Sequence, residues 1–204
     1  LVTGLLLAAL RASLDFQRHL ARTDGLTGLY VRRAFEERLQ HDLALARRRR
    51  SAVSLAFIDL DDFKSINDRR GHVEGDRVLQ VVGRALKLSV READTAARLG
   101  GDEFALVLPE ADDEGAQQAI NKVRAGLQDV LTAEGLEAVT CSIGVVTFRQ
   151  PPASLEGAVA SADALMYEVK RQGKGAVAFR VLGTRDPPAA AADPSRQVAG
   201  AGSA

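Results

Sequence analysis

Apolar residues recur along the chain with two spacings, one typical of helices and one typical of strands. Phe35, Leu39 and Leu43 repeat at helical spacing, in a helix that we expect to run from about Val31 to the four arginines at residues 47–50. A continuous apolar run at residues 53–60 has the length of a buried strand instead. Across the chain, these patterns predict helices near residues 5–21, 31–50, 62–67, 75–90, 113–131 and 155–171, and strands near residues 53–60, 94–99, 103–108, 138–148 and 176–181.

Two of the predicted strands, near residues 94–99 and 103–108, are joined across Gly100 and Gly101. Paired glycines tolerate the positive φ angles of a tight hairpin turn. Helices and strands otherwise follow one another without strict alternation, which predicts an α+β fold with helices packed on a sheet. The chain has neither a G-x-x-x-x-G-K-[ST] loop nor a G-x-G-x-x-G motif after a strand, so the two common nucleotide-binding folds are not supported.

The 204 residues are enough for one domain with extensions. We expect a linker or signalling helix over residues 1–22, one globular domain over residues 23–182, and an unstructured tail rich in Ala, Pro and Gly over residues 183–204. The apolar opening at residues 1–10 is too short to span a bilayer, and two interpretations stay open: the end of a transmembrane helix, or the apolar face of a soluble helix. Because the sequence begins at Leu1, we expect a fragment or processed product.

Charged side chains balance, with 27 Lys and Arg against 27 Asp and Glu. General nucleic-acid or anionic-membrane binders usually carry a basic excess, so we expect no nucleic-acid partner. Any anionic ligand must then be held by a local cluster. The single cysteine, Cys141, excludes an internal disulfide and a metal site built from cysteines.

Three carboxylates, Asp59, Asp61 and Asp62, lie at the end of an apolar strand. Like charges this close repel each other unless a cation or solvent offsets them. Mg²⁺ prefers a few carboxylates together with phosphate oxygens and water, which suits such a cluster. If this strand pairs with the glycine hairpin, Asp59 and Asp102 could share one metal ion. The alternative, that these acids are exposed turn residues, stays open on residue types alone.

Asn67 and Asp76 carry groups suited to reading guanine. Guanine presents one acceptor and two adjacent donors on its pairing edge, and a carboxylate can accept from both donors while an asparagine amide donates or accepts nearby. Adenine would leave such a carboxylate without its donors, which disfavours a cyclase that uses ATP. By residue type alone, Asn67 is more often a turn residue and Asp76 a solvated acid at a helix start.

Taken together, these segments resemble the GGDEF family of diguanylate cyclases, over about residues 24–181 and with the motifs in the family's order and spacing. The matching motifs are Asp24-Gly25-Leu26-Thr27-Gly28-Leu29 followed by Arg32, Asp59-Leu60-Asp61, Phe63-Lys64, Ile66-Asn67-Asp68, Gly71-His72, Gly75-Asp76, Arg98 before Gly100-Gly101-Asp102-Glu103-Phe104, and Tyr167, Lys170, Gly173 and Lys174. The resemblance implies a central, mostly antiparallel sheet flanked by helices, similar to the nucleotidyl cyclase and polymerase palm with its ferredoxin-like core.

The resemblance also implies a role for each matching residue. Asp59, the backbone carbonyl of Leu60 and Asp102 would hold Mg²⁺, or Mn²⁺ in its place. Asp102 is also the family's proposed base for the attacking 3′-hydroxyl, with Glu103 beside it, and Lys64 would stabilise charge on the phosphates. The residues implied in substrate binding are Phe63, Asn67, His72, Asp76, Arg98, Gly101, Lys170 and Lys174.

One domain of the resembled family holds one GTP, so two domains must face each other as a homodimer to make cyclic di-GMP. Arg91 and Asp94 match the family's R-x-x-D inhibitory site, where an arginine fork and a carboxylate suit the phosphates and guanine edges of cyclic di-GMP. The alternative for this pair is a surface salt bridge. The domain would be cytoplasmic, with its sensor and any membrane anchor of the parent receptor outside this chain.

Two positions depart from the family's pattern. Val31 stands where the family usually has Asn, and Lys174-Gly175 stands where it more often has Arg-Asn; lysine keeps the charge but loses the bidentate fork. The alternative function is a catalytically silent module that binds cyclic di-GMP or GTP as a sensor. Because the acids implied in metal binding and catalysis are all present, the sequence favours the enzyme.

Overall fold

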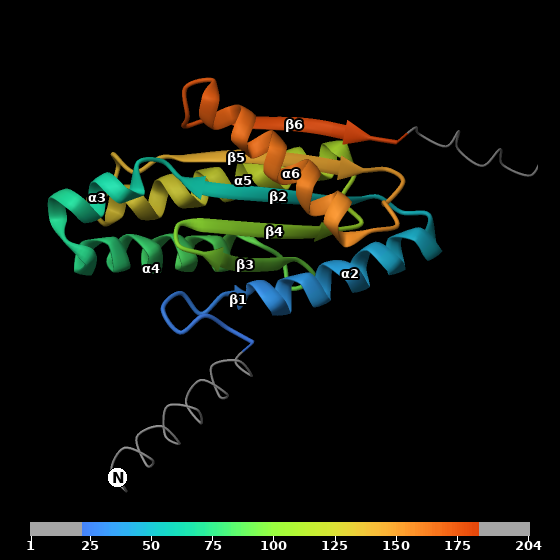
Figure 1. Ribbon diagram of the computed structural model, residues 1–204, viewed down its shortest axis with the longest axis horizontal. Helices are drawn as coiled ribbons and strands as arrows, with labels where there is room; N and C mark the ends of the chain where they lie inside the picture. Colours follow the sequence, from blue (N-terminus) through green and yellow to red (C-terminus); the bar gives the residue numbers. More distant parts are fainter. Residues whose placement is uncertain (1–21, 184–204) are drawn as a thin grey trace, which may run out of the picture.

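The computed structural model describes residues 22–183, in which a six-stranded sheet is covered by helices on both faces (Figure 1). The elements are β1 (Tyr30–Val31), α2 (Arg32–Arg49), β2 (Val53–Leu60), α3 (Phe63–Arg70), α4 (His72–Ser89), β3 (Thr95–Gly100), β4 (Glu103–Pro109), α5 (Asp113–Ala133), β5 (Cys141–Phe148), α6 (Leu155–Arg171) and β6 (Val177–Leu182). The strand order is β1-β3-β4-β2-β5-β6. The four inner strands pair antiparallel and the two edge strands pair parallel. The predicted α+β fold with a mostly antiparallel sheet is confirmed.

Strand β2 shows why the sheet is apolar on both sides. Val53, Leu55 and Phe57 pack with α2 and α6, whereas Ile58 and Leu60 pack with α4 and α5. Successive side chains of a strand point to opposite faces, and a strand covered on both faces needs apolar residues throughout. Figure 1 shows the two helix pairs on opposite sides of the sheet. The unbroken apolar run at residues 53–60 is therefore the buried strand that it was predicted to be.

A glycine sets the boundary between α3 and α4. Gly71 has a φ of 81°, a left-handed conformation that glycine adopts without steric cost. Because this residue alone breaks the helical path, α4 begins at His72, earlier than the predicted start near residue 75. Its predicted apolar face is confirmed, since Val78, Val82 and Leu86 are fully buried against the sheet.

Other boundaries also differ from the prediction. The two-residue strand β1, parallel to β3, was missed because two residues give no recognisable periodicity. The strand expected from about residue 138 begins at Cys141, because the preceding Thr140 turns to bind Asp61. The predicted N-terminal helix, with its transmembrane alternative, and the predicted tail lie outside the described residues. Within residues 22–183, no helix combines the length and apolar character that crossing a bilayer requires.

The hairpin between β3 and β4 turns at the end of the sheet where β2 stops and α3 begins (Figure 1). Gly100 and Gly101 have φ angles of 149° and 52°, so both occupy conformations that favour glycine. The register of the two strands shifts between Arg98 and Gly100, which is a bulge of the kind that re-aims side chains next to a site. The predicted glycine hairpin is confirmed.

Candidate active site

The end of β2 and the β3–β4 hairpin bring the predicted metal-binding acids together. Asp59 is the penultimate residue of β2 and is only 4% exposed. The antiparallel register places it directly opposite Glu103 of β4. The next residue, Leu60, donates its backbone N–H to the carbonyl oxygen of Asp102 at 3.2 Å. Asp59 and Asp102 therefore lie at the adjoining ends of two paired strands.

The charge of Asp59 is set by its surroundings. Burial raises the pKa of the Asp59 carboxyl, and the nearby charges of Asp102 and Glu103 raise it further. Lys170, in the last turn of α6, opposes this shift because its Nζ lies 2.6 Å from Asp59 Oδ2. A buried carboxylate beside two other acids needs a positive charge to stay ionised. In this structure the Lys170 ammonium group supplies that positive charge.

The oxygen atoms at this corner fit a hard divalent cation. Two carboxylates and the backbone carbonyl of Leu60 are the ligand types that Mg²⁺ prefers, and Mg²⁺ keeps further positions for water and substrate phosphates. Among residues 22–183, no group of three or more His, Cys, Asp or Glu side chains is arranged to hold a metal ion. The residues therefore suit an ion shared with a bound phosphate group better than an ion enclosed by protein alone.

Asp61, the next acid along the chain, accepts three hydrogen bonds through its carboxylate. Its carboxylate accepts from Thr140 Oγ1 at 2.7 Å, from Ser142 Oγ at 2.7 Å and from the backbone N–H of Gly175 at 2.9 Å. These bonds join the end of β2 to the start of β5 and to the loop after α6. Asp61 therefore holds this loop in place, and nothing in the sequence indicated its partners.

The loop after α6 carries a second ammonium group to the same corner. Lys174 Nζ lies 2.7 Å from Asp62 Oδ1, and this hydrogen bond raises the pKa of Lys174. Lys174 and Gly175 have φ angles of 64° and 60°. The resembled family more often has Asn at the second of these positions, and both Asn and Gly enter the left-handed region readily. The departure at Gly175 therefore preserves the path of the loop.

An ion pair that the sequence did not reveal holds the hairpin turn. Arg98 donates from Nε and Nη2 to the carbonyl oxygen of Gly101 at 3.0 and 2.8 Å, and its Nη1 lies 3.2 Å from Asp24. Asp24 also accepts from the N–H and hydroxyl of Thr27, a D-x-x-T pattern typical of a side-chain-capped turn. Arg98 thus positions the turn that carries Asp102, while its role in substrate binding stays a prediction.

A second arginine supports the hairpin from the start of α2. Arg32 donates from Nε to the backbone carbonyl of Leu99 at 3.1 Å, and its Nη2 lies 3.4 Å from Glu103 Oε2. Val31, beside it, lies in β1 opposite Arg98 of β3. The position where the resembled family usually has Asn therefore takes part in backbone pairing next to the hairpin.

Replacing Asp24 by asparagine should lower the free energy of unfolding by about 1–2 kcal/mol at neutral pH, because the charge-assisted bond to Arg98 is lost. Burial of the Asp24 carboxyl opposes ionisation, but hydrogen bonds from Thr27 and Arg98 outweigh it and hold the pKa below its ordinary value. This stabilisation is present above the unfolded-state pKa and is lost as the pH falls through the folded-state pKa. Urea unfolding at several pH values should show the gap to wild type closing over that acidic range.

The matched control for this prediction is Asp129→Asn. The Asp129 side chain is exposed on α5 and makes no hydrogen bond or ion pair with another residue of the described range, so its replacement should leave stability unchanged at every pH. A gap between wild type and Asp24→Asn that stays constant down to the acid limit would contradict an electrostatic role for Asp24.

The residues predicted to read guanine gather at the junction of α3 and α4. A Cβ placed on Gly75 would lie 2.0 Å from Asn67 Oδ1 and 3.3 Å from Phe63 Cζ, so both side chains pack closely against α4 at this glycine. Asp76 is the next residue of α4 after Gly75. The predicted residues of these two helices that are exposed are Lys64, His72 and Asp76. The Asn67 amide thus lies against Gly75, the residue that precedes Asp76 in α4.

Arg91 and Asp94 lie just before β3, at a separate pocket. Asp94 is buried and accepts from the backbone N–H and from Nη2 of Arg91, both at 2.9 Å. These contacts raise the pKa of Arg91. The two residues therefore form the salt bridge that the sequence left open. Both also line a pocket of about 390 Å³, and the Arg91 side chain remains 60% exposed there.

Known proteins similar to this chain share the same family. A sequence model described as "Diguanylate cyclase, GGDEF domain" matches residues 21–176. The chain is 38% identical over 169 residues to diguanylate cyclase DgcP of Pseudomonas aeruginosa, covering 81% of this chain and 25% of that protein. It is 35% identical over 159 residues to diguanylate cyclase VdcA of Vibrio cholerae, covering 76% of this chain and 45% of that protein. The chain thus spans less than half of either relative.

Solved structures show the same arrangement of elements. The GGDEF domain of DgcB from Caulobacter crescentus, in complex with c-di-GMP, matches with a TM-score of 0.69 and 31% identity over 78% of this chain and 92% of that chain. Diguanylate cyclase SiaD of Pseudomonas aeruginosa, in complex with its activator SiaC, matches with a TM-score of 0.72 and 33% identity over 87% of this chain and 70% of that chain. The family match over residues 21–176 includes every residue of the site described above.

Proposed function

The chain belongs to the GGDEF domain family, and we propose that it is a diguanylate cyclase that joins two GTP molecules into cyclic di-GMP and releases two pyrophosphates. One observation carries this proposal: Asp59 and Asp102 meet at the ends of paired strands, with a lysine ammonium group beside them. Phosphoryl transfer needs positive charge and precise positioning more than it needs covalent chemistry from the protein. A corner that concentrates carboxylates and ammonium groups supports that kind of reaction.

We propose that Asp59, Asp102 and the backbone carbonyl of Leu60 bind Mg²⁺, with Mn²⁺ as an alternative. When bound, such an ion would lower the pKa of the attacking 3′-hydroxyl and offset charge on the phosphates. The Asp102 carboxylate, half-buried on the hairpin, would accept the proton of that hydroxyl, with Glu103 beside it. The backbone bond between Leu60 and Asp102 supports this assignment, because it fixes the proton acceptor beside the end of β2.

The lysines of this corner would neutralise the triphosphate. The 3′-oxygen of one GTP attacks the α-phosphorus of the other, pyrophosphate leaves, and negative charge builds on the leaving oxygens. Lys170 and Lys174 hold their ammonium groups beside Asp59 and Asp62, and we infer that these groups turn toward phosphate oxygens when GTP binds. Lys64, exposed in the first turn of α3, would act with them.

Guanine would be read at the junction of α3 and α4. The Asp76 carboxylate would accept from the two adjacent donors of the base, and the Asn67 amide would complete the pairing edge. His72 and Phe63 would line the same pocket. The packing of Asn67 against α4 supports this assignment, because it holds an amide close to the helix that carries Asp76.

The reaction requires two domains, because each is proposed to hold one GTP. Two copies that face each other across a two-fold axis would supply both halves of the site, so we propose a homodimer. The helix expected before Asp24, whose predicted residues 5–21 lie outside the described range, would control this pairing in response to an upstream sensor. The proposed substrate is a cytoplasmic nucleotide, so the domain would act in the cytoplasm, and any membrane anchor would belong to the parent receptor.

Arg91→Ala should weaken inhibition by cyclic di-GMP by about tenfold or more while leaving turnover without added product unchanged. The expected reason is the loss of a guanidinium fork for the phosphates, since charge-assisted bonds of this kind contribute about 1.5–3 kcal/mol. The check is the initial rate measured over a series of product concentrations, with Lys87→Ala as a control in the wall of the same pocket. Unchanged inhibition in Arg91→Ala would refute the assignment of the inhibitory site.

Incubation of the purified protein with GTP and Mg²⁺ tests the proposed activity. Mass spectrometry should detect cyclic di-GMP and pyrophosphate from the wild type and neither product from Asp102→Ala. The alternative, a silent module that binds cyclic di-GMP or GTP as a sensor, predicts GTP affinity without turnover. If the wild type binds GTP but forms no product, the proposed function changes from a cyclase to a sensor.

A further inference from the structure

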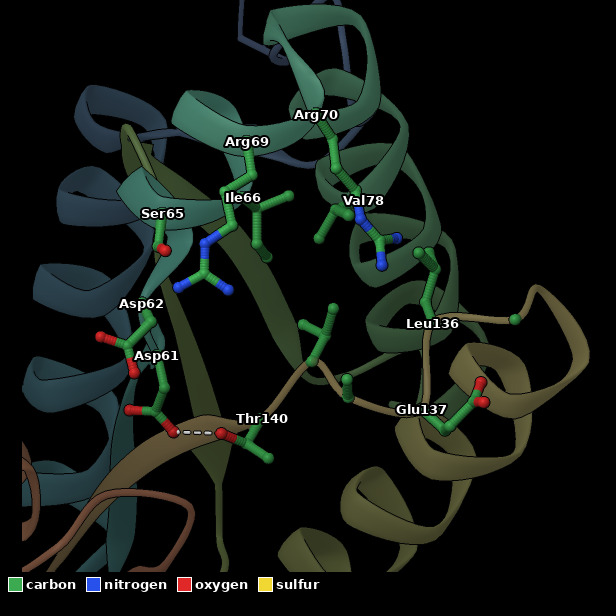
Figure 2. A pocket seen from close by; sticks show the side chains of 13 residues that line it. Asp61, Asp62, Ser65, Ile66, Arg69, Arg70, Val78, Leu136, Glu137 and Thr140 are labelled. Carbon is green, nitrogen blue, oxygen red and sulfur yellow. Dashed lines mark hydrogen bonds between the residues drawn. The ribbon is translucent and has the colours of Figure 1, made fainter.

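A pocket of about 540 Å³ lies between α3, α4 and the connection from α5 to β5 (Figure 2). Its volume falls in the range of about 300–1,000 Å³ that is typical of small-molecule sites. It is distinct from the proposed GTP site, because none of the residues proposed to bind GTP lines it: Phe63, Lys64, Asn67, His72, Asp76, Lys170 and Lys174. Helix α3 thus contributes side chains to two different hollows.

Two arginine side chains point into this pocket. Figure 2 shows the guanidinium groups of Arg69 and Arg70 projecting from α3 into the hollow. The Arg69 guanidinium makes no hydrogen bond or ion pair within residues 22–183, and the Arg70 guanidinium pairs only with Glu74, at 3.9 Å. The two aspartates of the pocket are engaged elsewhere, Asp61 by its three hydrogen bonds and Asp62 by a lysine. Apart from Glu74, neither guanidinium group has an ion-pair partner in the described part of the chain, so both can pair with an anionic ligand.

The only other acid that lines the pocket is Glu137. Figure 2 shows its carboxylate turned away from the hollow, and no ion pair joins it to any described residue. The backbone N–H groups of Glu137 and Ala138 also make no hydrogen bond within the described range. This side of the pocket can therefore offer polar edges to a ligand whose charge is held by the arginines.

The floor of the pocket is apolar. Val78, Leu136 and Val139 are buried members of the core under the pocket, and Ile66 packs on the same core. An arginine fork recognises phosphate or carboxylate, and an apolar floor beside it favours a flat ring that excludes water. An inorganic anion would leave this floor exposed, and an uncharged ring would leave the arginines without a partner.

We propose that this pocket binds a nucleoside monophosphate, with the phosphate between Arg69 and Arg70 and the base on the floor formed by Ile66 and Val139. The unpaired backbone N–H groups of Glu137 and Ala138 would contact the polar edge of the base. This proposal does not rest on cyclase activity. A ligand here would contact α3, the helix that also carries Asn67.

Titration of methyl-labelled protein with AMP tests the proposal, since adenine does not suit the proposed guanine site. The methyl resonances of Ile66, Val78, Leu136 and Val139 should shift in a saturable manner. Arg69→Ala/Arg70→Ala should raise the dissociation constant about tenfold or more, because two charge-assisted contacts are lost. Inorganic phosphate should bind about tenfold or more weakly than AMP, because it cannot use the apolar floor.

Two further variants keep the result interpretable. Arg48→Ala/Arg50→Ala removes two exposed arginines of the same charge elsewhere and should leave AMP affinity unchanged. Ala138→Trp fills the apolar half of the pocket from an exposed position and should also abolish the methyl shifts. The proposal is overturned if AMP causes no saturable shift, if it shifts only methyls near the proposed GTP site, if both arginine pairs behave alike, or if phosphate binds as tightly as AMP.

Discussion

Replacing Asp59 by asparagine should slow the formation of cyclic di-GMP by about a thousandfold or more, because a metal-binding carboxylate at the reacting phosphates is lost. The amide has nearly the same shape, so packing at the end of β2 is retained. In the wild type, burial and repulsion from Asp102 and Glu103 raise the pKa of the Asp59 carboxyl. Removing the Asp59 charge relieves this repulsion. The domain should therefore stay folded while activity falls. The measurement is the initial rate of product formation by chromatography.

Asp163→Asn is the matched control for the loss of one acid. The Asp163 side chain is exposed on α6 and makes no hydrogen bond or ion pair within residues 22–183. Its replacement should leave the rate within about twofold of the wild type, as expected for a surface change away from the site. A full rate in Asp59→Asn, with an unchanged dependence on Mg²⁺, would remove Asp59 from the mechanism.

Replacing Gly144 by alanine should destabilise the domain by about 3 kcal/mol or more, because the new Cβ meets backbone atoms that cannot rotate away. Gly144 lies in β5 where α6 crosses the sheet. Its Cβ would lie 2.2 Å from the backbone nitrogen of Met166 and 2.8 Å from the carbonyl carbon of Leu165. Strand and helix would have to move apart, and α6 carries Lys170 toward Asp59. Urea unfolding should therefore show lower stability, and surviving activity should fall as well.

Gly25→Ala is the control for this prediction. A Cβ at Gly25 would meet no atom within 4 Å, and its φ is not in the left-handed region. Alanine there should change stability by less than about 1 kcal/mol. If Gly144→Ala unfolds at the same urea concentration as wild type, α6 does not pack against β5 as closely as the structure has it.

Long and well-marked elements could be predicted from the sequence because their local patterns agree with their tertiary surroundings. The strand at residues 53–60 and the helix at residues 155–171 have the predicted bounds. Strand β1 could not be predicted, because its two residues are ordered only by pairing with β3. The start of β5 was placed too early for a similar reason: Thr140 is drawn out of the strand by a carboxylate that is distant in sequence.

The candidate site also has features that the sequence predicted and features that it did not. The meeting of Asp59 and Asp102 could be predicted, because a glycine hairpin beside a central strand brings the ends of both together. Bonds between distant side chains left no local signal, and the pairs Asp24–Arg98 and Asp59–Lys170 were therefore missed. The conformation of a loop residue such as Gly175 likewise emerges only from the hydrogen bond that its N–H donates to Asp61.

Manganese binding measured by electron paramagnetic resonance, with a GTP analogue that cannot react, tests most directly whether two strand ends share one cation. We expect one tightly held ion per domain, lost in Asp59→Asn and equally in Asp102→Asn. Combining both changes should add little further loss, because the two residues act on the same ion. If either single variant holds manganese as tightly as the wild type, the two acids do not form one metal site.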